Sequence, residues 1–374
     1  MKITSIRTSG LGDATYLVAH EGIGVVVDPQ RDIARFETAA ADAGVEVRFI
    51  LETHLHNDYV SGGRDLATRT GAELVIPASG AVAYDHKPAF HLEDLDGGPL
   101  TVRPIHTPGH TPEHMSYLVL IEGEPIAVFS GGSLLVGAAG RPDLLGFDRA
   151  EQLARLQYIS VNRLAELPDD VGLYPTHGEG SFCTATGAGK STSTIGAEKL
   201  DNPVLHYSDA DAFVKGQLGG LQPYPDYYAH MGPINLMGPT PLAQATVPEL
   251  AAGAVPADAA IVDMRPRGAF AAGHIPGSIG IEYGDQVGVW AGWLLPFDQP
   301  IVLVADHGQD VAEAVAQFGR IGFDHVVGVM YDVAAWAELN GPLATYKQES
   351  ARDLAARIAS GEEVQVVDVR APNE

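Results

Sequence analysis

Apolar runs broken by turn residues organise the first half of the chain. The run that begins at Gly22 is stopped by Asp28-Pro29, which is typical of a strand entering a loop. The spacing of apolar positions predicts strands at 22–28, 45–51 and 73–76 and helices at 33–43 and 63–70. Strands that alternate with helices in this way predict an α/β fold.

Three further strands are expected at 100–105, 115–121 and 125–130. From about 180 to 245 the chain is rich in Gly, Pro and Thr with weak periodicity, and we interpret this stretch as a partly helical connection. The pattern starts again at Thr246, with a helix expected over 247–252 and buried strands over 260–263 and 300–304. A second α/β unit therefore follows the first.

The second unit contains the start of an internal repeat. Val247–Gly253 followed by Ile261–Arg265 recurs as Arg352–Ile358 followed by Val366–Arg370. One helix and one strand cannot bury a core alone. We therefore predict domains at 1–245 and 246–347, and we expect 348–374 to be the start of a third domain that is cut off at the chain end.

Composition and charge narrow the class of protein. A chain of 374 residues is long enough for two or three domains. Its formal net charge of −25 repels nucleic acid and anionic lipid, because both bind through Lys and Arg. The sequence has no apolar run of about 18 residues and no signal peptide at Met1–Arg7. We expect a cytoplasmic protein without nucleic-acid or membrane partners.

Histidine is the metal ligand that the composition favours. One cysteine, Cys183, excludes an intrachain disulfide and a cysteine-rich zinc site, whereas the chain has 14 histidines. Imidazole and carboxylate are therefore the expected ligands of any metal. Cys183 itself could line a substrate pocket or be a small buried apolar residue, and burial is the commoner state of a free cysteine.

One short motif concentrates candidate ligands. In Thr53-His54-Leu55-His56-Asn57-Asp58, histidines at i and i+2 and an aspartate at i+4 follow a predicted strand, so an extended backbone points all three to one side. Such convergence is what metal coordination needs. Two turns can each bring a further ligand, His110 in Pro108-Gly109-His110-Thr111 and His177 in Pro175-Thr176-His177-Gly178.

These motifs resemble those of metallo-β-lactamase-fold proteins. The first is similar to the signature T-H-x-H-x-D-H, and the branch that it resembles most is that of glyoxalase II and the persulfide dioxygenases. Supporting matches over about 1–240 are Val27-Asp28-Pro29, Thr107-Pro108-Gly109-His110-Thr111, Gly140-Arg141-Pro142-Asp143-Leu144 and Pro175-Thr176-His177-Gly178. The resemblance implies an αββα sandwich with a metal at one edge, between two sheets.

Two residues depart from the family pattern. Tyr59 stands where the family has a histidine for a second metal, and Gly132 stands where it has a metal-binding aspartate. The resemblance then implies one metal with open positions, held by His54, His56 and His110. Water or an unrecognised carboxylate is the alternative replacement for the aspartate. The expected catalytic residues, which would face substrate or orient ligands and water, are Asp58, Tyr59 and His177.

The second unit resembles a rhodanese domain. Val262-Asp263-Met264-Arg265 followed by Gly273-His274-Ile275-Pro276-Gly277 is similar to the signature D-x-R and G-H-I-P-G-A, over about 245–345. Rhodaneses carry sulfur on a cysteine in the loop C-x-x-G-x-R, where the thiolate is the nucleophile. The corresponding loop, Ala305-Asp306-His307-Gly308-Gln309-Asp310, lacks both cysteine and arginine. We therefore expect an inactive sulfurtransferase module in which Asp263, Arg265 and His274 serve the fold.

Three functions are open from the sequence. The first is a mononuclear enzyme that oxidises a low-molecular-weight thiol persulfide with O2 at one Fe(II), which the fusion to a sulfur-handling domain favours. The second is a Zn(II)-dependent thioester hydrolase of glyoxalase II type, in which zinc activates water. The third is a degenerate metal-binding or sulfur-carrier scaffold without catalysis. The resemblance also allows a homodimer, since many relatives are dimers.

Overall fold

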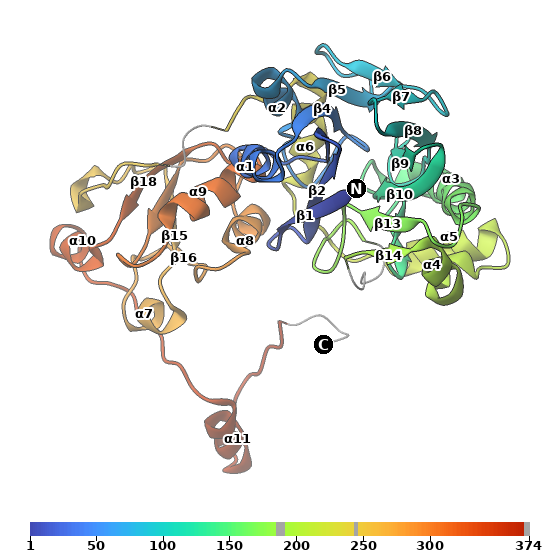
Figure 1. Cartoon of the computed structure of the whole chain (residues 1–374). Coiled ribbons are helices and arrows are strands. Elements are labelled where there is room, and N and C mark those ends of the chain that lie inside the picture. The colour runs from blue at the N-terminus through green and yellow to red at the C-terminus, as the bar shows by residue number, and fades with distance from the viewer. Residues whose placement is uncertain (185–190, 243–245, 370–374) are drawn as a thin grey trace.

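The N-terminal part of the protein is a sandwich of two six-stranded sheets, seen in a computed structural model that describes residues 1–184, 191–242 and 246–369 (Figure 1). The first sheet has the order β1-β2-β3-β4-β5-β6. In chain order its strands are Lys2–Thr8, Asp13–His20, Ile23–Val27, Glu46–Leu51, Glu73–Pro77 and Lys87–Ala89. The pairs β1–β2 and β2–β3 are antiparallel, and the pairs from β3 to β6 are parallel.

The second sheet has the order β14-β13-β10-β9-β8-β7. Its strands are β7 (Leu95–Asp96), β8 (Thr101–His106), β9 (Met115–Ile121), β10 (Glu124–Gly131), β13 (Gly172–Pro175) and β14 (Ser193–Thr194), and a hairpin of β11 (Leu134–Leu135) and β12 (Ala138–Ala139) follows β10. Side chains of β9 alternate, because successive residues of a strand face opposite sides. Tyr117 and Val119 join the core between the sheets, whereas Leu118 and Leu120 join the core under the helices.

Helices cover the outer face of each sheet. Phe36 of α1 (Ala34–Ala43) and Leu66 of α2 (Gly63–Thr70) are buried against the first sheet. The second sheet is covered by α3 (Phe147–Ala165), α4 (Ile195–Asp201), the short 3-10 helix Pro203–Leu205 and α5 (Ala210–Gly219). This arrangement confirms the predicted αββα sandwich. None of the helices in the described ranges is long and apolar enough to cross a lipid bilayer.

The second α/β unit has a four-stranded parallel sheet of order β16-β15-β17-β18. Its strands are β15 (Ala260–Asp263), β16 (Ile279–Gly280), β17 (Ile301–Val304) and β18 (Val326–Met330), and its helices are α7 (Arg267–Ala272), α8 (Val287–Leu294), α9 (Val311–Arg320) and α10 (Val333–Asn340). Strand β17 is buried along its whole length, as expected of a central parallel strand. Helix α6 (Tyr228–Met237) packs against the second unit, since Tyr228 and Met231 share a buried cluster with core residues of that unit.

The predicted helix at 247–252 is wrong. Pro248 and Leu250 pair with the edge of β18 through two backbone hydrogen bonds with Val329, 3.0 and 2.8 Å long, and a 3-10 helix follows only at Ala252–Ala254. Proline cannot donate to a helical ladder, and the unpaired edge of a parallel sheet offers this segment better partners. Apolar spacing alone did not reveal this competition.

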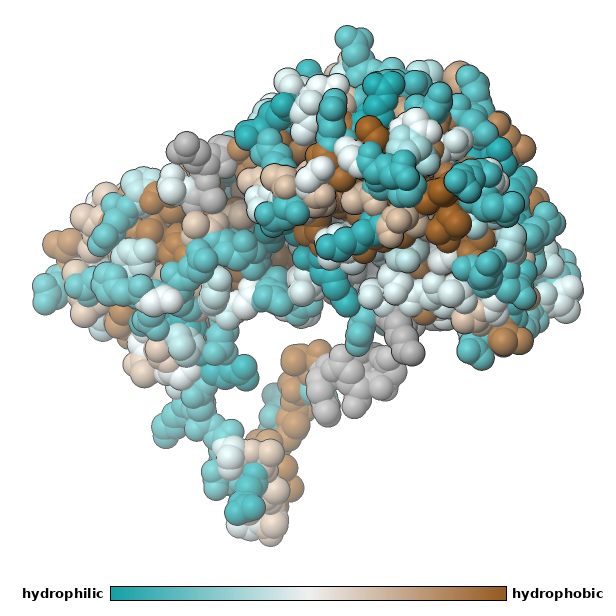
Figure 2. Space-filling model, viewed as in Figure 1, coloured by the Kyte–Doolittle hydropathy of each residue, from teal (hydrophilic) through white to brown (hydrophobic). Residues whose placement is uncertain are grey.

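The second copy of the repeat has formed a helix but no strand. Helix α11 (Ala351–Ala359) begins at Ser350, whose side chain accepts from the backbone N–H of Asp353. The following residues up to 369 are not in a strand, and Val366, Val367 and Val369 are exposed on a tail that stands apart from the two units (Figures 1 and 2). The last part of the repeat, Arg370 and 371–374, lies outside the described residues. A third domain at 348–374 and the boundaries at 245 and 347 stay predictions.

Removing one aromatic ring from the core between the sheets tests this packing. Phe129 of β10 is fully buried between the sheets. We expect Phe129→Ala to lower the free energy of unfolding by about 3–5 kcal/mol, because it leaves a cavity. Phe147→Ala is the control, because Phe147 is 76% exposed. Urea denaturation measures both, and equal stability of the two variants would contradict the described core.

Candidate metal centre

The loop between β4 and α2 carries two of the three predicted ligands, His54 and His56, and Asp28 anchors its start, whereas His110 lies between β8 and β9. Asp28 accepts from the backbone N–H and the hydroxyl of Thr53, both at 2.7 Å, and from the hydroxyl of Thr176. These bonds join the end of β3 to the ends of β4 and β13. His54 and His177 directly follow the two threonines, so Asp28 fixes their backbones relative to each other.

Three imidazoles each have one nitrogen held by an acceptor. His110 Nδ1 lies 2.7 Å from the carbonyl of Arg141, and His177 Nδ1 lies 2.9 Å from an Asp13 carboxylate oxygen. His54 Nδ1 lies 2.8 Å from Oγ1 of Thr53, whose own proton is donated to Asp28. Each Nδ1 is therefore the protonated nitrogen, and each Nε2 carries a free lone pair.

The three free nitrogens converge. His54, His110 and His177 offer atoms that all lie within 4.8 Å of one another, and all three residues are buried. His54 Nε2 and His177 Nε2 are 3.4 Å apart, and His110 Nε2 has no hydrogen-bond partner among the described residues. Nitrogens at about 2.0–2.1 Å from a tetrahedral metal lie about 3.3 Å apart, so this spacing fits a bound cation.

His56 is oriented the other way. Its Nε2 lies 3.2 Å from Asp28, 3.5 Å from Glu52 and 2.9 Å from the hydroxyl of Tyr59. Its Nδ1 has no hydrogen-bond partner in the described part of the chain and lies 4.0 Å from Asp58. The structure thus brings His54 and His110 together as the sequence predicts, but it groups them with His177 and not with His56.

Asp58 and Tyr59 occupy opposite sides of His56. Both carboxylate oxygens of Asp58 are buried without a hydrogen bond from any described residue, and one lies 3.4 Å from His177 Nδ1. Tyr59 is fully buried and stacks on the His56 ring at 4.2 Å. Asp58 therefore lies beside Nδ1 of His177, the nitrogen that Asp13 also approaches, whereas the Tyr59 hydroxyl contacts Nε2 of His56.

The His110 ring fills the space beside Gly132. A Cβ atom at position 132 would lie 2.2 Å from Cδ2 of His110. The backbone N–H of Gly132 donates to Nε2 of His114 at 2.9 Å, and the other nitrogen of His114 lies 2.9 Å from Thr107 Oγ1. An aspartate at 132 would have no room beside His110 in this position, and His114 has no nitrogen left for a metal.

Burial sets the charge of the imidazoles. Burial and neighbouring histidines lower the pKa of His54 and His110 well below 6.5, and burial lowers the pKa of His177 as well. These three rings are therefore neutral at pH 7, as metal ligands must be. Burial also acts against the charged form of His56, but the Asp28 and Glu52 carboxylates outweigh it and raise the pKa of His56 well above 6.5.

The residues present fit a metal ion. Unpartnered buried polar atoms cost about 1–3 kcal/mol each, and the described residues place several of them together, on His110, His56 and Asp58. A second group, His56, Asp58 and His177, also has metal-ligand spacing, but it shares His177 with the first. A third group, Asp28, Glu52 and His56, shares no residue with the first, but its carboxylates already accept from Thr53 and Ser61 and lie 3.2 and 3.5 Å from Nε2 of His56. Asp13 occupies Nδ1 of His177, so its Nε2 can serve only one ion. The arrangement offers one complete three-histidine set at a time.

Sequence reasoning missed several residues that shape this centre. His114 lies four residues after His110 and stacks on His54 at 4.9 Å, and this spacing was visible in the sequence. Asp13 had no such signal, because its segment and that of His177 meet only in the fold, and Glu52 lies four residues before His56 but outside the recognised motif. Burial raises the pKa of Asp13 to about 7, and the same cause raises that of Asp58 to about 7.

The loop at 305–310 corresponds to the sulfur-carrying loop of a rhodanese, and here the Gln309 side chain bridges it. Gln309 accepts from the N–H of Asp306 at 2.8 Å and donates to the carbonyl of Met264 at 2.6 Å. Ala305 is fully buried and offers no nucleophile. Cys183 lies elsewhere, buried 3.8 Å from the hydroxyl of Tyr228, and burial raises the pKa of its thiol well above 9. Neither place holds a reactive thiolate.

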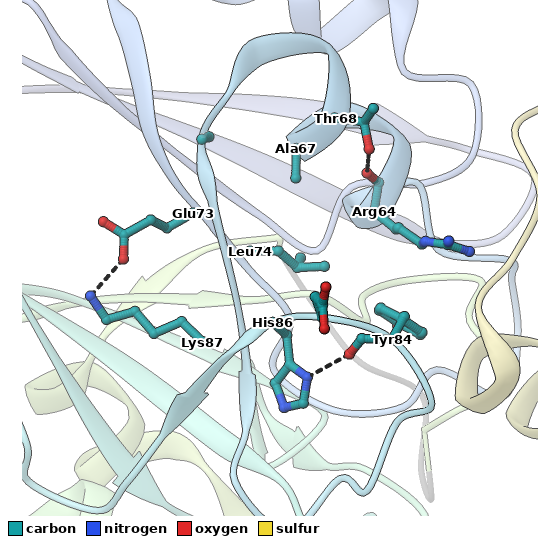
Figure 3. Close-up of a pocket in the computed structure, with 10 residues that line it drawn as sticks. Arg64, Ala67, Thr68, Glu73, Leu74, Tyr84, His86 and Lys87 are labelled. Atoms are coloured by element: carbon teal, nitrogen blue, oxygen red, sulfur yellow. Dashed lines mark hydrogen bonds and ion pairs between the residues drawn. The ribbon is translucent and has the colours of Figure 1, made fainter.

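A pocket of about 530 Å3 lies away from the ligand loop, between α2, β5 and β6 (Figure 3). Lys87 forms an ion pair with Glu73 at 2.6 Å, and His86 bonds to the carbonyl of Tyr84. Arg64 lies over the Tyr84 ring. None of the predicted site residues lines this pocket, so it does not belong to the metal centre.

Two family models match the chain. The Metallo-beta-lactamase superfamily matches residues 10–177, and the Rhodanese-like domain matches residues 246–339. A hydroxyacylglutathione hydrolase of Acidiphilium cryptum is 30% identical over 223 residues, which are 54% of this chain and 88% of that protein. A protein of Burkholderia pseudomallei named "Probable metallo-hydrolase" is 32% identical over 204 residues, 44% of this chain and 67% of that protein.

Two solved structures resemble the fold. A metallo-beta-lactamase from Staphylococcus aureus has a TM-score of 0.80 and 29% identity, and it covers 88% of this chain and 98% of its own. ETHE1 from Myxococcus xanthus has a TM-score of 0.54 and 27% identity, and it covers 63% of this chain and 98% of its own. The first likeness extends over both units, and the second is confined to a smaller part of the chain.

A methyl group at position 132 tests the close approach to His110. We expect Gly132→Ala to lower the free energy of unfolding by about 1–3 kcal/mol and to weaken zinc binding, because the His110 ring must move. Gly308→Ala is the control, since a Cβ there meets nothing within 4 Å. Urea denaturation and chelator competition measure the two effects. Wild-type stability and zinc affinity in Gly132→Ala would show that the ring is not confined as described.

Proposed function

Because the chain belongs to the metallo-beta-lactamase superfamily and carries a rhodanese-like domain, we propose that it is a mononuclear metal-dependent enzyme that oxidises a small thiol persulfide with O2. Three converging Nε2 atoms on His54, His110 and His177 carry this proposal, because each ring is held by a bond to its Nδ1. Hydrogen bonds of this kind fix the tautomer and the direction of a metal-binding imidazole.

The ligand set favours one metal with open positions. Histidine ligands suit both Fe(II) and Zn(II), and iron is our proposal for the oxidation. Tyr59 and Gly132 supply no ligand, and the group with His56 and Asp58 needs the same His177. The carboxylates of the third group, Asp28 and Glu52, are already engaged by Thr53, Ser61 and His56. An iron ion in this site would supply positions at which a sulfur anion and O2 can both bind.

Charge supports an anionic substrate. His54, His110 and His177 are neutral, so a divalent ion would keep its double positive charge in their company. A persulfide is more acidic than a thiol and binds as an anion. Oxidation of the terminal sulfur of this anion by one O2, with one water, gives sulfite, the free thiol and one proton, in addition to the proton released when the persulfide ionises. The rhodanese-like domain associates the site with the same sulfur chemistry.

Asp58 is the group that we assign to proton handling. Its two carboxylate oxygens are buried next to His177 and have no donor among the described residues, so they can accept a proton from substrate or water. His56 stands beside it, with Nδ1 facing Asp58 and Nε2 held by Asp28 and Glu52. We assign to His56 a positive charge 4.0 Å from the Asp58 carboxylate, while Tyr59 holds the His56 ring in place.

A thioester hydrolase is the second candidate, and the relatives favour it. The hydroxyacylglutathione hydrolase of Acidiphilium cryptum is similar over 88% of its own length. Zinc in the same site would lower the pKa of a bound water to about 7. Asp58 would then take the proton from water, and the same three histidines would hold the metal.

Removal of one histidine tests the proposal. We expect the iron-loaded protein to consume O2 with glutathione persulfide as the probe. We expect His110→Ala to lose bound iron and to lower the rate of O2 uptake by more than about 100-fold. Residues that only orient ligands have smaller effects, of about 10- to 100-fold. His307→Ala is the matched control, since His307 is exposed in the rhodanese-like domain. Elemental analysis and an oxygen electrode give the two readouts.

The other outcomes separate the alternatives. Hydrolysis of a glutathione thioester by the zinc-loaded protein, without O2 uptake by the iron-loaded protein, would replace the proposal by the hydrolase. Tight metal binding with neither reaction would support the scaffold. Full O2 uptake by His110→Ala would contradict the assigned ligand set.

A further inference from the structure

The backbone of the ligand loop is held by parts of the chain outside residues 10–177. From His56 to Ser61, five backbone groups form hydrogen bonds with α6, with the residue before α6, or with the end of α9. The family model that matches the metal-binding fold ends at 177. The loop that carries His56 and Asp58 is therefore shaped by elements that the matched region does not contain.

Asn235 makes three of these five bonds. Its amide nitrogen donates to the carbonyls of His56 and Tyr59, both at 2.9 Å, and its amide oxygen accepts from the N–H of Ser61 at 2.8 Å. Asn235 is 1% exposed, so water does not compete for these bonds. One side chain thus spans the turn that follows the histidine pair.

Two other groups complete the set. The hydroxyl of Tyr227 donates to the carbonyl of Asp58 at 3.1 Å. The N–H of Val60 donates to the carbonyl of Arg320, the last residue of α9, at 2.7 Å. The second of these bonds comes directly from the rhodanese-like domain.

Ion pairs fasten the end of α9 against the residues that follow Asp28. Arg31 pairs with Asp324 and also donates to the carbonyls of Gly319 and Thr240. Arg320 pairs with Asp32 at 2.7 Å and with Glu313 at 2.8 Å. Arg31 and Arg320 are 4% and 8% exposed. The Asp324 and Glu313 side chains are 45% and 41% exposed and that of Asp32 is 15% exposed, so the Arg320–Asp32 pair is the one best shielded from solvent.

Apolar contacts seal the same interface. Tyr59 and Val60 belong to one buried cluster with Tyr227 and Met231 and with Phe318 and Ile321 of the rhodanese-like domain. Removing the rhodanese-like domain would expose the back of the ligand loop. The domain lacks a sulfur-carrying cysteine, but it has a structural connection to the metal centre.

We propose that Asn235, Tyr227 and the end of α9 form a clamp that positions the metal-binding loop, with Asn235 as its main positioning residue. In this clamp the rhodanese-like domain has a role that needs no cysteine, because the end of its helix α9 holds the backbone of Val60. The proposal rests on the proposed function only in requiring that the histidine cluster binds a metal. Asn235 touches neither metal nor substrate and acts through the backbone of His56, Tyr59 and Ser61.

Asn202 offers a matched control for Asn235. It is also fully buried, and its amide donates to the carbonyls of Leu135 and Ala138 while its oxygen accepts from the N–H of Val204. None of these partners lies in the ligand loop. Asn235→Leu and Asn202→Leu each remove a buried amide with similar backbone partners, so both should lower the melting temperature.

The test is metal binding by the full chain, measured with Zn2+ by chelator competition and with Co2+ by its visible absorption. We expect Asn235→Leu to weaken Zn2+ binding by about 10-fold and to shift the Co2+ bands, because the loop that Asn235 holds also carries the ligand His54, and groups that orient ligands have effects of about 10- to 100-fold. Asn202→Leu should keep wild-type affinity and bands. Tyr227→Phe loses the hydrogen bond to the carbonyl of Asp58 and should weaken Zn2+ binding a few-fold. This variant replaces Asn235→Leu in the test if Asn235→Leu does not fold.

The outcomes distinguish the two proposals. A wild-type protein that binds neither metal would overturn the proposed function together with the clamp. Metal binding by the wild type that is unchanged in Asn235→Leu, or in Tyr227→Phe where that variant is used, would overturn the clamp alone. Equal weakening in Asn202→Leu and Asn235→Leu would show a general effect of stability and would also overturn it.

Discussion

The site depends on one constraint, which is that each buried imidazole must have one nitrogen fixed by an acceptor. In His54, His110 and His177 the fixed nitrogen is Nδ1, so the three Nε2 lone pairs meet at one point. In His56 the fixed nitrogen is Nε2, because Asp28 and Glu52 lie behind it. The acceptors come from β2 and from the segments that follow β3, β4 and β12, so the whole sandwich decides which nitrogens face the metal.

The two units are parts of one arrangement around the ligand loop. The sandwich supplies the histidines, while α6 and α9 hold the backbone that carries His56 and Asp58. In a rhodanese the loop after the central strand carries sulfur, but here Gln309 fills that loop and Ala305 replaces the nucleophile. What the rhodanese-like domain keeps is its packing surface, and this surface lies against the metal-binding loop.

Local pattern predicted eight strands and helices between 22 and 130 to within one residue at each end, because alternation and turn residues there agree with the fold, but it missed the short strands β6 and β7. The same reasoning failed at 247–252, where the edge of β18 competes with helix formation. Two of three predicted ligands, His54 and His110, lie together. The grouping of His177 with these two depends on Asp13, which is far from it in sequence. The reversed orientation of His56 depends in part on Glu52, which is close in sequence but belongs to no motif. Asn235 was equally invisible, because its partners are backbone atoms.

X-ray absorption of the protein loaded with zinc or iron tests the central claim most directly, because it counts ligands and neighbouring metals without requiring a substrate. If His54, His110 and His177 are the ligand set, we expect one metal per chain with three imidazole nitrogens, at about 2.0–2.1 Å for zinc. We expect no metal neighbour in the spectrum. A second metal at about 3.5–4 Å, or a first shell with fewer than three imidazoles, would contradict the assignment of His54, His110 and His177 as the ligand set.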